Sequence, residues 1–184
     1  MRKFTLLCLS CILLLSGCSN TKKDNKESMK NYESYIDAIL TNQGVDTKII
    51  PFDYNLNVYK QKNNAYQYEV EISNPRVAMY HVQAIAVDPK LDSNTNVYPC
   101  IGLLGEDATK AFNMIPYQGN AQTGFIRGFS LDGISTEKQF SLQVMVTWKD
   151  ASLVKNNRVF FKVNYAEVVD DSQEGKKETA DTSN

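Results

Sequence analysis

The chain has 184 residues, of which 42% are hydrophobic and 22% are charged, and its formal net charge is −1. This length and composition are typical of one globular domain with extra segments at its ends. Because nucleic-acid binding calls for a basic patch, the weakly acidic balance argues against DNA or RNA as a partner.

The first 17 residues have the layout of a secretory signal peptide. Arg2 and Lys3 form a short basic start, and an apolar run without charges follows from Phe4 to Ser16. A membrane-spanning helix needs about 20 apolar residues, so this run is too short to span comfortably. A basic start followed by a short apolar run is typical of an export signal that is later removed. We therefore predict a signal peptide over residues 1–17.

The end of the apolar run carries the most specific motif in the chain. Leu15-Ser16-Gly17-Cys18 resembles the lipobox of bacterial lipoprotein precursors. The resemblance implies cleavage between Gly17 and Cys18 and a diacylglycerol attached to the Cys18 sulfur. An ordinary secretory signal and an uncleaved anchor are the alternatives. The expected location is the extracytoplasmic face of the cell membrane, with the membrane contacted through the lipid on Cys18.

The other cysteines agree with this interpretation. Cys8 and Cys11 lie within the predicted signal peptide, and Cys100 is the one cysteine after Cys18. The mature domain is therefore expected to have no intramolecular disulfide. Cys100 has apolar neighbours and no adjacent base or cation in the sequence, so we expect a buried small side chain and not a reactive thiol. The few cysteines, with many Asn and Lys residues, favour a Gram-positive source.

A lipidated tether and one helix are predicted next. Residues 18–27 are polar and have no apolar periodicity, which is typical of a disordered segment. Residues 28–42 place apolar side chains three and four positions apart, the spacing of one helix face. These side chains are Met29, Tyr32, Ile36, Ile39 and Leu40. We expect this amphipathic helix to pack on the domain's own core; the membrane or a partner is the alternative.

From residue 49 onward the hydrophobic period changes to two. Three segments alternate clearly and four alternate weakly. The clear ones are 65–73, 140–148 and 158–168, and the weak ones are 54–60, 79–87, 97–104 and 124–131. Short alternating strands without long amphipathic segments between them favour antiparallel pairing over a parallel α/β sheet.

We predict a mainly β fold, an antiparallel Ig-like β-sandwich over residues 49–169 preceded by one amphipathic helix. The sandwich is similar, at the level of its pattern, to small Ig-like modules of Gram-positive lipoproteins. That likeness implies no site residues.

Two segments fall outside the strand pattern. Residues 105–124 are the least strand-like part of the domain. Within them, 106–114 predicts either a short helical turn capped by Asp107 or a loop that crosses between sheets. Residues 170–184 have no large apolar side chain, which is typical of a disordered tail.

His81 is the only histidine in the chain. One histidine cannot form a His-based metal site, and no nucleophile motif accompanies it. We expect a histidine on a strand surface or half-buried. No catalytic residue, metal ligand or cofactor is predicted.

The segment 88–96 has the beginning of a calcium-binding pattern. Asp92, Asn94 and Asn96 alternate like the first ligands of an EF-hand loop. The Gly and Glu that the pattern then requires are absent, because positions 97 and 103 hold Val and Leu. A turn rich in Asp, Asn and Pro is the expected structure, with a looser calcium site as the alternative.

The expected function is a non-catalytic binding or interaction module near the membrane surface, with a protein partner in the cell envelope. This expectation rests on the short tether, the absence of catalytic motifs and the loops at both ends of a sandwich. A solute- or calcium-binding lipoprotein is the alternative. An envelope hydrolase is less favoured, because no acid–base pair or nucleophile can be named.

Overall fold

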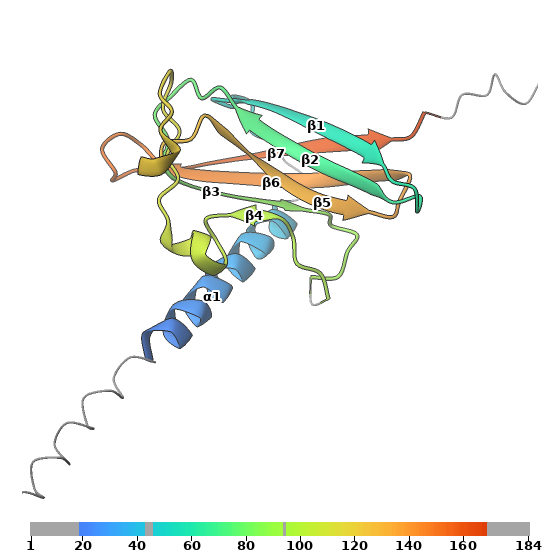
Figure 1. The fold of residues 1–184 in the computed structure, drawn as a ribbon, viewed down its shortest axis with the longest axis horizontal. Helices are drawn as coiled ribbons and strands as arrows, with labels where there is room; N and C mark the ends of the chain where they lie inside the picture. The colour runs from blue at the N-terminus through green and yellow to red at the C-terminus, as the bar shows by residue number, and fades with distance from the viewer. Residues whose placement is uncertain (1–18, 43–45, 94, 169–184) are drawn as a thin grey trace, which may run out of the picture.

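The chain forms three layers in the computed structural model, which describes residues 19–42, 46–93 and 95–168 (Figure 1). Within these residues, one helix is followed by seven strands, with two 3₁₀ turns between the fourth and fifth strands. In chain order they are α1 (Ser19–Thr41), β1 (Asp53–Lys60), β2 (Tyr66–Ser73), β3 (Tyr80–Val87), β4 (Cys100–Ile101), η2 (Gly105–Thr109), η3 (Ala121–Thr123), β5 (Gly128–Ser135), β6 (Gln139–Lys149) and β7 (Asn156–Ala166).

The strands form two antiparallel sheets that pack together like a sandwich. Their order is β1-β2-β5 in one sheet and β4-β3-β6-β7 in the other. Alternate residues of each strand point inward, because successive side chains of a strand lie on opposite faces. The inward residues of two central strands, one from each sheet, are Tyr66, Tyr68, Val70 and Ile72 on β2 and Phe140, Leu142, Val144, Val146 and Trp148 on β6. The prediction of a mainly β, two-sheet fold is confirmed.

One close approach in the three-stranded sheet requires glycine. Tyr68 on β2 lies opposite Gly133 on β5. A Cβ at position 133 would overlap the Tyr68 ring, so the glycine lets this ring cross the neighbouring strand. The ring is thereby buried, and its centroid lies 5.5 Å from that of Phe140 in the opposite sheet.

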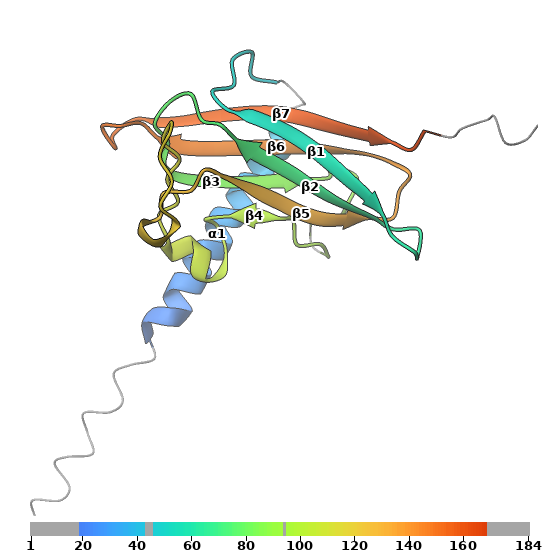
Figure 2. The ribbon, with the colours of Figure 1, turned by 45° about the horizontal axis from the view of Figure 1, so that its top comes forward.

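The four-stranded sheet is buried on both faces where α1 covers it (Figure 2). Ile36 and Ile39 of the helix form a second buried cluster with Ile85 of β3 and Met145 of β6. Met145 is apolar at a position where the alternation of β6 predicts a polar side chain, because α1 covers this position and shields it from solvent. Of the three expected outcomes for the helix, packing on the domain is the one observed.

The helix begins at Ser19 instead of the predicted Ser28. Residues 19–27, which we expected to form an irregular tether, are its first turns. This segment contains neither Gly nor Pro. Because the packed turns from Tyr32 onward already fix the helix, adding further turns avoids the cost of nucleation.

Five of the seven predicted strands lie within two residues of their predicted bounds. The other two are shifted or shortened. The predicted strand 97–104 pairs only over Cys100–Ile101, because Gly102 has a φ of 72° and turns the chain away. The predicted strand 124–131 begins at Gly128 and continues to Ser135.

The connection between β4 and β5 crosses from one sheet to the other. It contains η2, so both structures expected for residues 106–114 are present in part. Asp107 is not the cap of this turn. The N-cap position is Leu104, and no side chain caps it.

Candidate functional site

The outer face of the four-stranded sheet is divided into two halves of opposite character. The half beneath α1 is apolar and includes Ile85, Met145 and Phe160. The half beyond the helix is polar, and we call it the polar platform. Its five side chains come from alternate positions of three neighbouring strands, and they are Gln83 on β3, Thr147 and Lys149 on β6, and Asn156 and Arg158 on β7.

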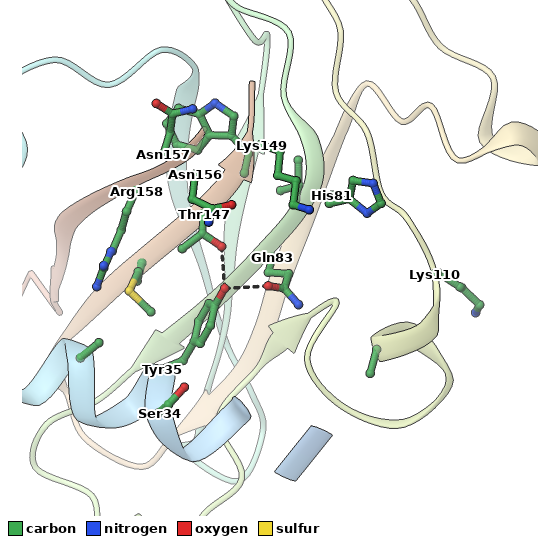
Figure 3. A pocket seen from close by; sticks show the side chains of 15 residues that line it. Ser34, Tyr35, His81, Gln83, Lys110, Thr147, Lys149, Asn156, Asn157 and Arg158 are labelled. Atoms are coloured by element: carbon green, nitrogen blue, oxygen red, sulfur yellow. Dashed lines mark hydrogen bonds between the residues drawn. The ribbon is translucent and has the colours of Figure 1, made fainter. Parts of the chain in front are cut away.

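Tyr35 of α1 joins the helix to the polar platform (Figure 3). Its hydroxyl donates to Gln83 Oε1 at 2.7 Å and lies 2.6 Å from Thr147 Oγ1. With its own proton directed to Gln83, the Tyr35 oxygen accepts the proton of Thr147. Gln83 Nε2 in turn donates to the carbonyl oxygen of Gly102 at 2.7 Å. The chain of hydrogen bonds therefore connects α1, β3, β6 and the turn after β4.

The Tyr35 hydroxyl stays protonated at neutral pH. Burial raises its pKa above the ordinary value of 10.0. The hydrogen bond with Thr147 and the positive charge of Arg158 act in the opposite direction and are smaller.

A cleft of about 560 Å³ opens over the polar platform, between α1 and the segment that follows β4; we call it the platform cleft. Ser34 lines its helix side, and Ala108 and Lys110 line the opposite side. An adjoining cleft of about 620 Å³ shares Ser34, Gln83 and Ala108 with it and continues along α1 to Glu27. The two clefts follow the helix from its N-terminal half to the platform.

The lining of the platform cleft carries positive charge and no carboxylate. Lys110 pairs with Asp107 at 3.1 Å, which offsets part of its charge. Among the described residues, no ion pair involves Lys149 or Arg158. The Arg158 guanidinium lies 5.8 Å from the Phe160 ring centroid. Figure 3 shows Lys149 and Arg158 on opposite sides of Thr147.

His81 also lines the platform cleft. β3 is irregular there, because the pairing register with β6 shifts between Tyr80 and Gln83. His81 has a φ of 50°, which is uncommon outside glycine, and its N–H donates to Asn113 Oδ1 at 3.1 Å. The side chain is exposed, as expected for a histidine on a strand surface.

The described residues of the predicted turn, 88–93 and 95–96, are held by local hydrogen bonds. The buried Asp88 carboxylate accepts the N–H of Lys90 at 2.9 Å. The carbonyl oxygen of Asp92 accepts from Asn96 Nδ2 at 2.8 Å, and Asn94 lies outside the described residues. Within the described part of the chain, no group of three or more His, Cys, Asp or Glu residues is arranged to hold a metal ion.

Cys100 is half-buried on β4, at the edge of the second cluster. Burial raises the pKa of its thiol to about 11, and the charge of Asp107 adds to the rise. A hydrogen bond with the backbone of Leu104 opposes it. The thiol is therefore protonated at neutral pH, which agrees with the expected unreactive cysteine, but the side chain is half-buried where a buried one was expected.

Sequence patterns did not bring the platform residues together. Gln83, Thr147 and Arg158 each occupy the polar positions of ordinary strands, and nothing local marks them. The available signal is indirect. Met145 and Phe160 are apolar at positions where a solvated strand face would be polar, which indicates a covered half-face beside an open one. Cys18, Gly17, the signal peptide at 1–17 and the tail at 170–184 lie outside the described residues.

The chain is thus a two-sheet domain that carries a polar cleft between α1 and its four-stranded sheet. No family model, curated protein or solved structure matches the chain. A search of the described helices for one long and apolar enough to cross a membrane finds none.

Proposed function

We propose that this chain is a lipoprotein, anchored through Cys18 on the extracytoplasmic face of the cell membrane, that acts as a non-catalytic binding module. The observation that carries the binding role is the platform cleft. Polar side chains from three strands and one helix converge there on a preformed floor, and preformed concave sites with convergent polar groups are typical of ligand binding. The Leu15–Cys18 motif supports the anchor.

In this proposal a helix separates the anchor from the cleft. α1 begins at Ser19, directly after Cys18, and Tyr32 is the first of its described side chains to be buried. At 1.5 Å per residue, these 13 residues span about 20 Å. A helix keeps its direction where a flexible tether does not. The cleft is thereby held at a defined height above the membrane, within reach of envelope proteins.

An immunoglobulin-like topology is part of the same proposal. In that fold, strands A, B and E share one sheet and strands C, F and G share the other, to which some members add C′. Strand orders β1-β2-β5 and β4-β3-β6-β7 agree with A-B-E and C′-C-F-G. In that scheme α1 is an addition that covers half of the outer C′CFG face.

The anchor is tested by changing Cys18 to Ala. We expect the wild-type chain to incorporate labelled palmitate and to fractionate with membranes. The variant is expected to lack the label and to keep its signal peptide. Cys11→Ala is the matched control, because it removes a cysteine of the same region and should behave like wild type. A Cys18→Ala protein that matures and fractionates like wild type would contradict the proposal.

Binding through the cleft is tested with a photo-crosslinking residue at Ser34, which is exposed and lines both clefts. The matched control places the same group at Glu71, which is exposed on the three-stranded sheet. We expect one defined envelope component to be captured from position 34 and not from position 71. Equal capture at both positions, or none at either, would argue against the cleft.

A solute-binding lipoprotein is the second candidate function. The volume of the platform cleft, about 560 Å³, falls within the range of about 300–1,000 Å³ for small-molecule sites. A partner protein and a solute are distinguished by the Ser34 crosslink, because only a protein gives an adduct of much higher mass.

A further inference from the structure

We propose that the platform cleft binds an anionic group, a phosphate or a carboxylate, between Lys149 and Arg158. This inference rests on the proposed function, because it assigns a ligand chemistry to the cleft through which the protein is proposed to bind.

The register of β6 and β7 places the two cations diagonally on one face. Lys149 lies opposite Asn156, and Arg158 lies opposite Thr147. Diagonal neighbours in an antiparallel pair are about 7–8 Å apart. In Figure 3 the two charged ends point apart, but side chains as long as lysine and arginine can turn toward a common ligand between these positions. Asn156 and Thr147 occupy the other two corners. Asn156 adds an amide donor, whereas the Thr147 proton is already donated to Tyr35.

The charge distribution of the sandwich favours an anion at this place. Lys149 and Arg158 have like charges and, among the described residues, no carboxylate partner. An anion between them would replace repulsion by attraction. Acidic side chains are instead gathered on the outer face of the opposite sheet, at Glu69, Glu71 and Asp132. The strands of the three-stranded sheet thus present acidic side chains outward, whereas the open half of the four-stranded sheet presents Lys149 and Arg158.

The floor of the cleft is already held in place by hydrogen bonds within the protein. Tyr35 engages both Gln83 and Thr147, and Gln83 also binds the Gly102 carbonyl. Because these polar groups bond to one another and to the backbone, they do not occupy the positions beside Lys149 and Arg158 where a ligand would bind. The Lys149 ammonium and the Arg158 guanidinium are left to contact it, and guanidinium suits the paired oxygens of phosphate and carboxylate.

The test uses the full chain in nanodiscs of neutral phosphatidylcholine, titrated with inorganic phosphate at constant ionic strength. We expect the backbone amide signals of Thr147, Lys149, Asn156 and Arg158 to shift, with a dissociation constant on the order of 1 mM for so small a ligand. A second arm replaces part of the lipid by anionic phosphatidylglycerol. The same shifts without added phosphate would assign the site to a lipid headgroup, and a response only to added phosphate would assign it to a soluble anion.

Charge substitutions separate a site from a general effect of net charge. Lys149→Gln and Arg158→Gln should each weaken phosphate binding at least fivefold, and Lys149→Arg should retain it. Lys155→Gln is the matched control, because Lys155 is exposed in the loop that joins β6 to β7 and does not line the cleft. The dispersion of the amide spectrum checks that each variant is folded.

The inference is overturned if the cleft amides respond in neither arm, or if Lys155→Gln weakens binding as much as Lys149→Gln. Should the cleft amides stay silent while the Ser34 crosslink still forms, the anion inference falls and the proposed binding role stands. Should phosphate bind while no crosslink forms from Ser34, the anion site stands and the protein partner falls.

Discussion

Truncating Ile39 to Ala tests how α1 is held on the sheet. Ile39 is 1% exposed and belongs to the second cluster with Ile85, Val87 and Met145. The change removes three carbon atoms from this cluster. At about 0.8 kcal/mol for each buried carbon, their transfer to water alone costs about 2.4 kcal/mol. A residual cavity adds to this, and we expect a total loss of about 3 kcal/mol, within the range known for such truncations.

The loss is measured by urea unfolding of a chain that starts at Ser19, which contains every element of the fold. Trp148 is the only tryptophan in the sequence and lies in the core between the two sheets, so its fluorescence reports the unfolding of the sandwich. Far-UV circular dichroism follows α1. If the weakened helix separates before the sandwich unfolds, the two transitions of the variant will no longer coincide.

Leu40→Ala is the matched control, because Leu40 is the neighbouring residue and is 44% exposed. Its effect should stay within about 0.5 kcal/mol. A loss for Ile39→Ala that is no larger than that of Leu40→Ala would refute the conclusion that α1 is packed on the four-stranded sheet.

Two further predictions follow from pKa values raised by burial. Burial raises the pKa of Tyr68 from 10.0 to about 12, so its stabilising effect is complete below pH 10 and is lost as the pH rises toward 12. Across this window the unfolding free energy of wild type should fall by about 3 kcal/mol relative to that of Tyr68→Phe in urea titrations; a constant difference would contradict the burial of this hydroxyl. The Cys100 thiol, whose pKa is raised from 9.0 to about 11, should react with iodoacetamide at pH 8 about 100-fold more slowly in the folded chain than in urea. Equal rates in the two states would show that the thiol is not protected.

The strands could be predicted because their signal is local. In β2, Tyr66, Val70 and Ile72 alternate with polar residues, and this period of two survives in the structure. Predictions failed where the chain had to pass between layers. Gly102 ends β4 after two residues, and the crossing to β5 follows contacts that the local pattern does not contain. The early start of α1 at Ser19 has a similar origin, because packing further along the helix stabilises turns that have no apolar face of their own.

The platform cleft could not be predicted, because its residues are brought together by contacts between distant parts of the chain. Tyr35 is 48 positions from Gln83 and 112 from Thr147. In the sequence, each of these residues is an ordinary polar position on a helix or a strand. They form a site only because α1 covers one half of the outer face and stops short of the other.

By itself, the sequence determined the strand periodicity, the apolar face of the helix and the N-terminal motif that ends at Cys18. These features depend on neighbouring residues and on the fixed periods of helix and strand. The tertiary structure decided the sheet to which each strand belongs, the half-face that α1 covers and the diagonal placement of Lys149 and Arg158 on one face of the β6–β7 pair. Those outcomes depend on which buried surfaces fit one another across the whole chain, and that information is not local.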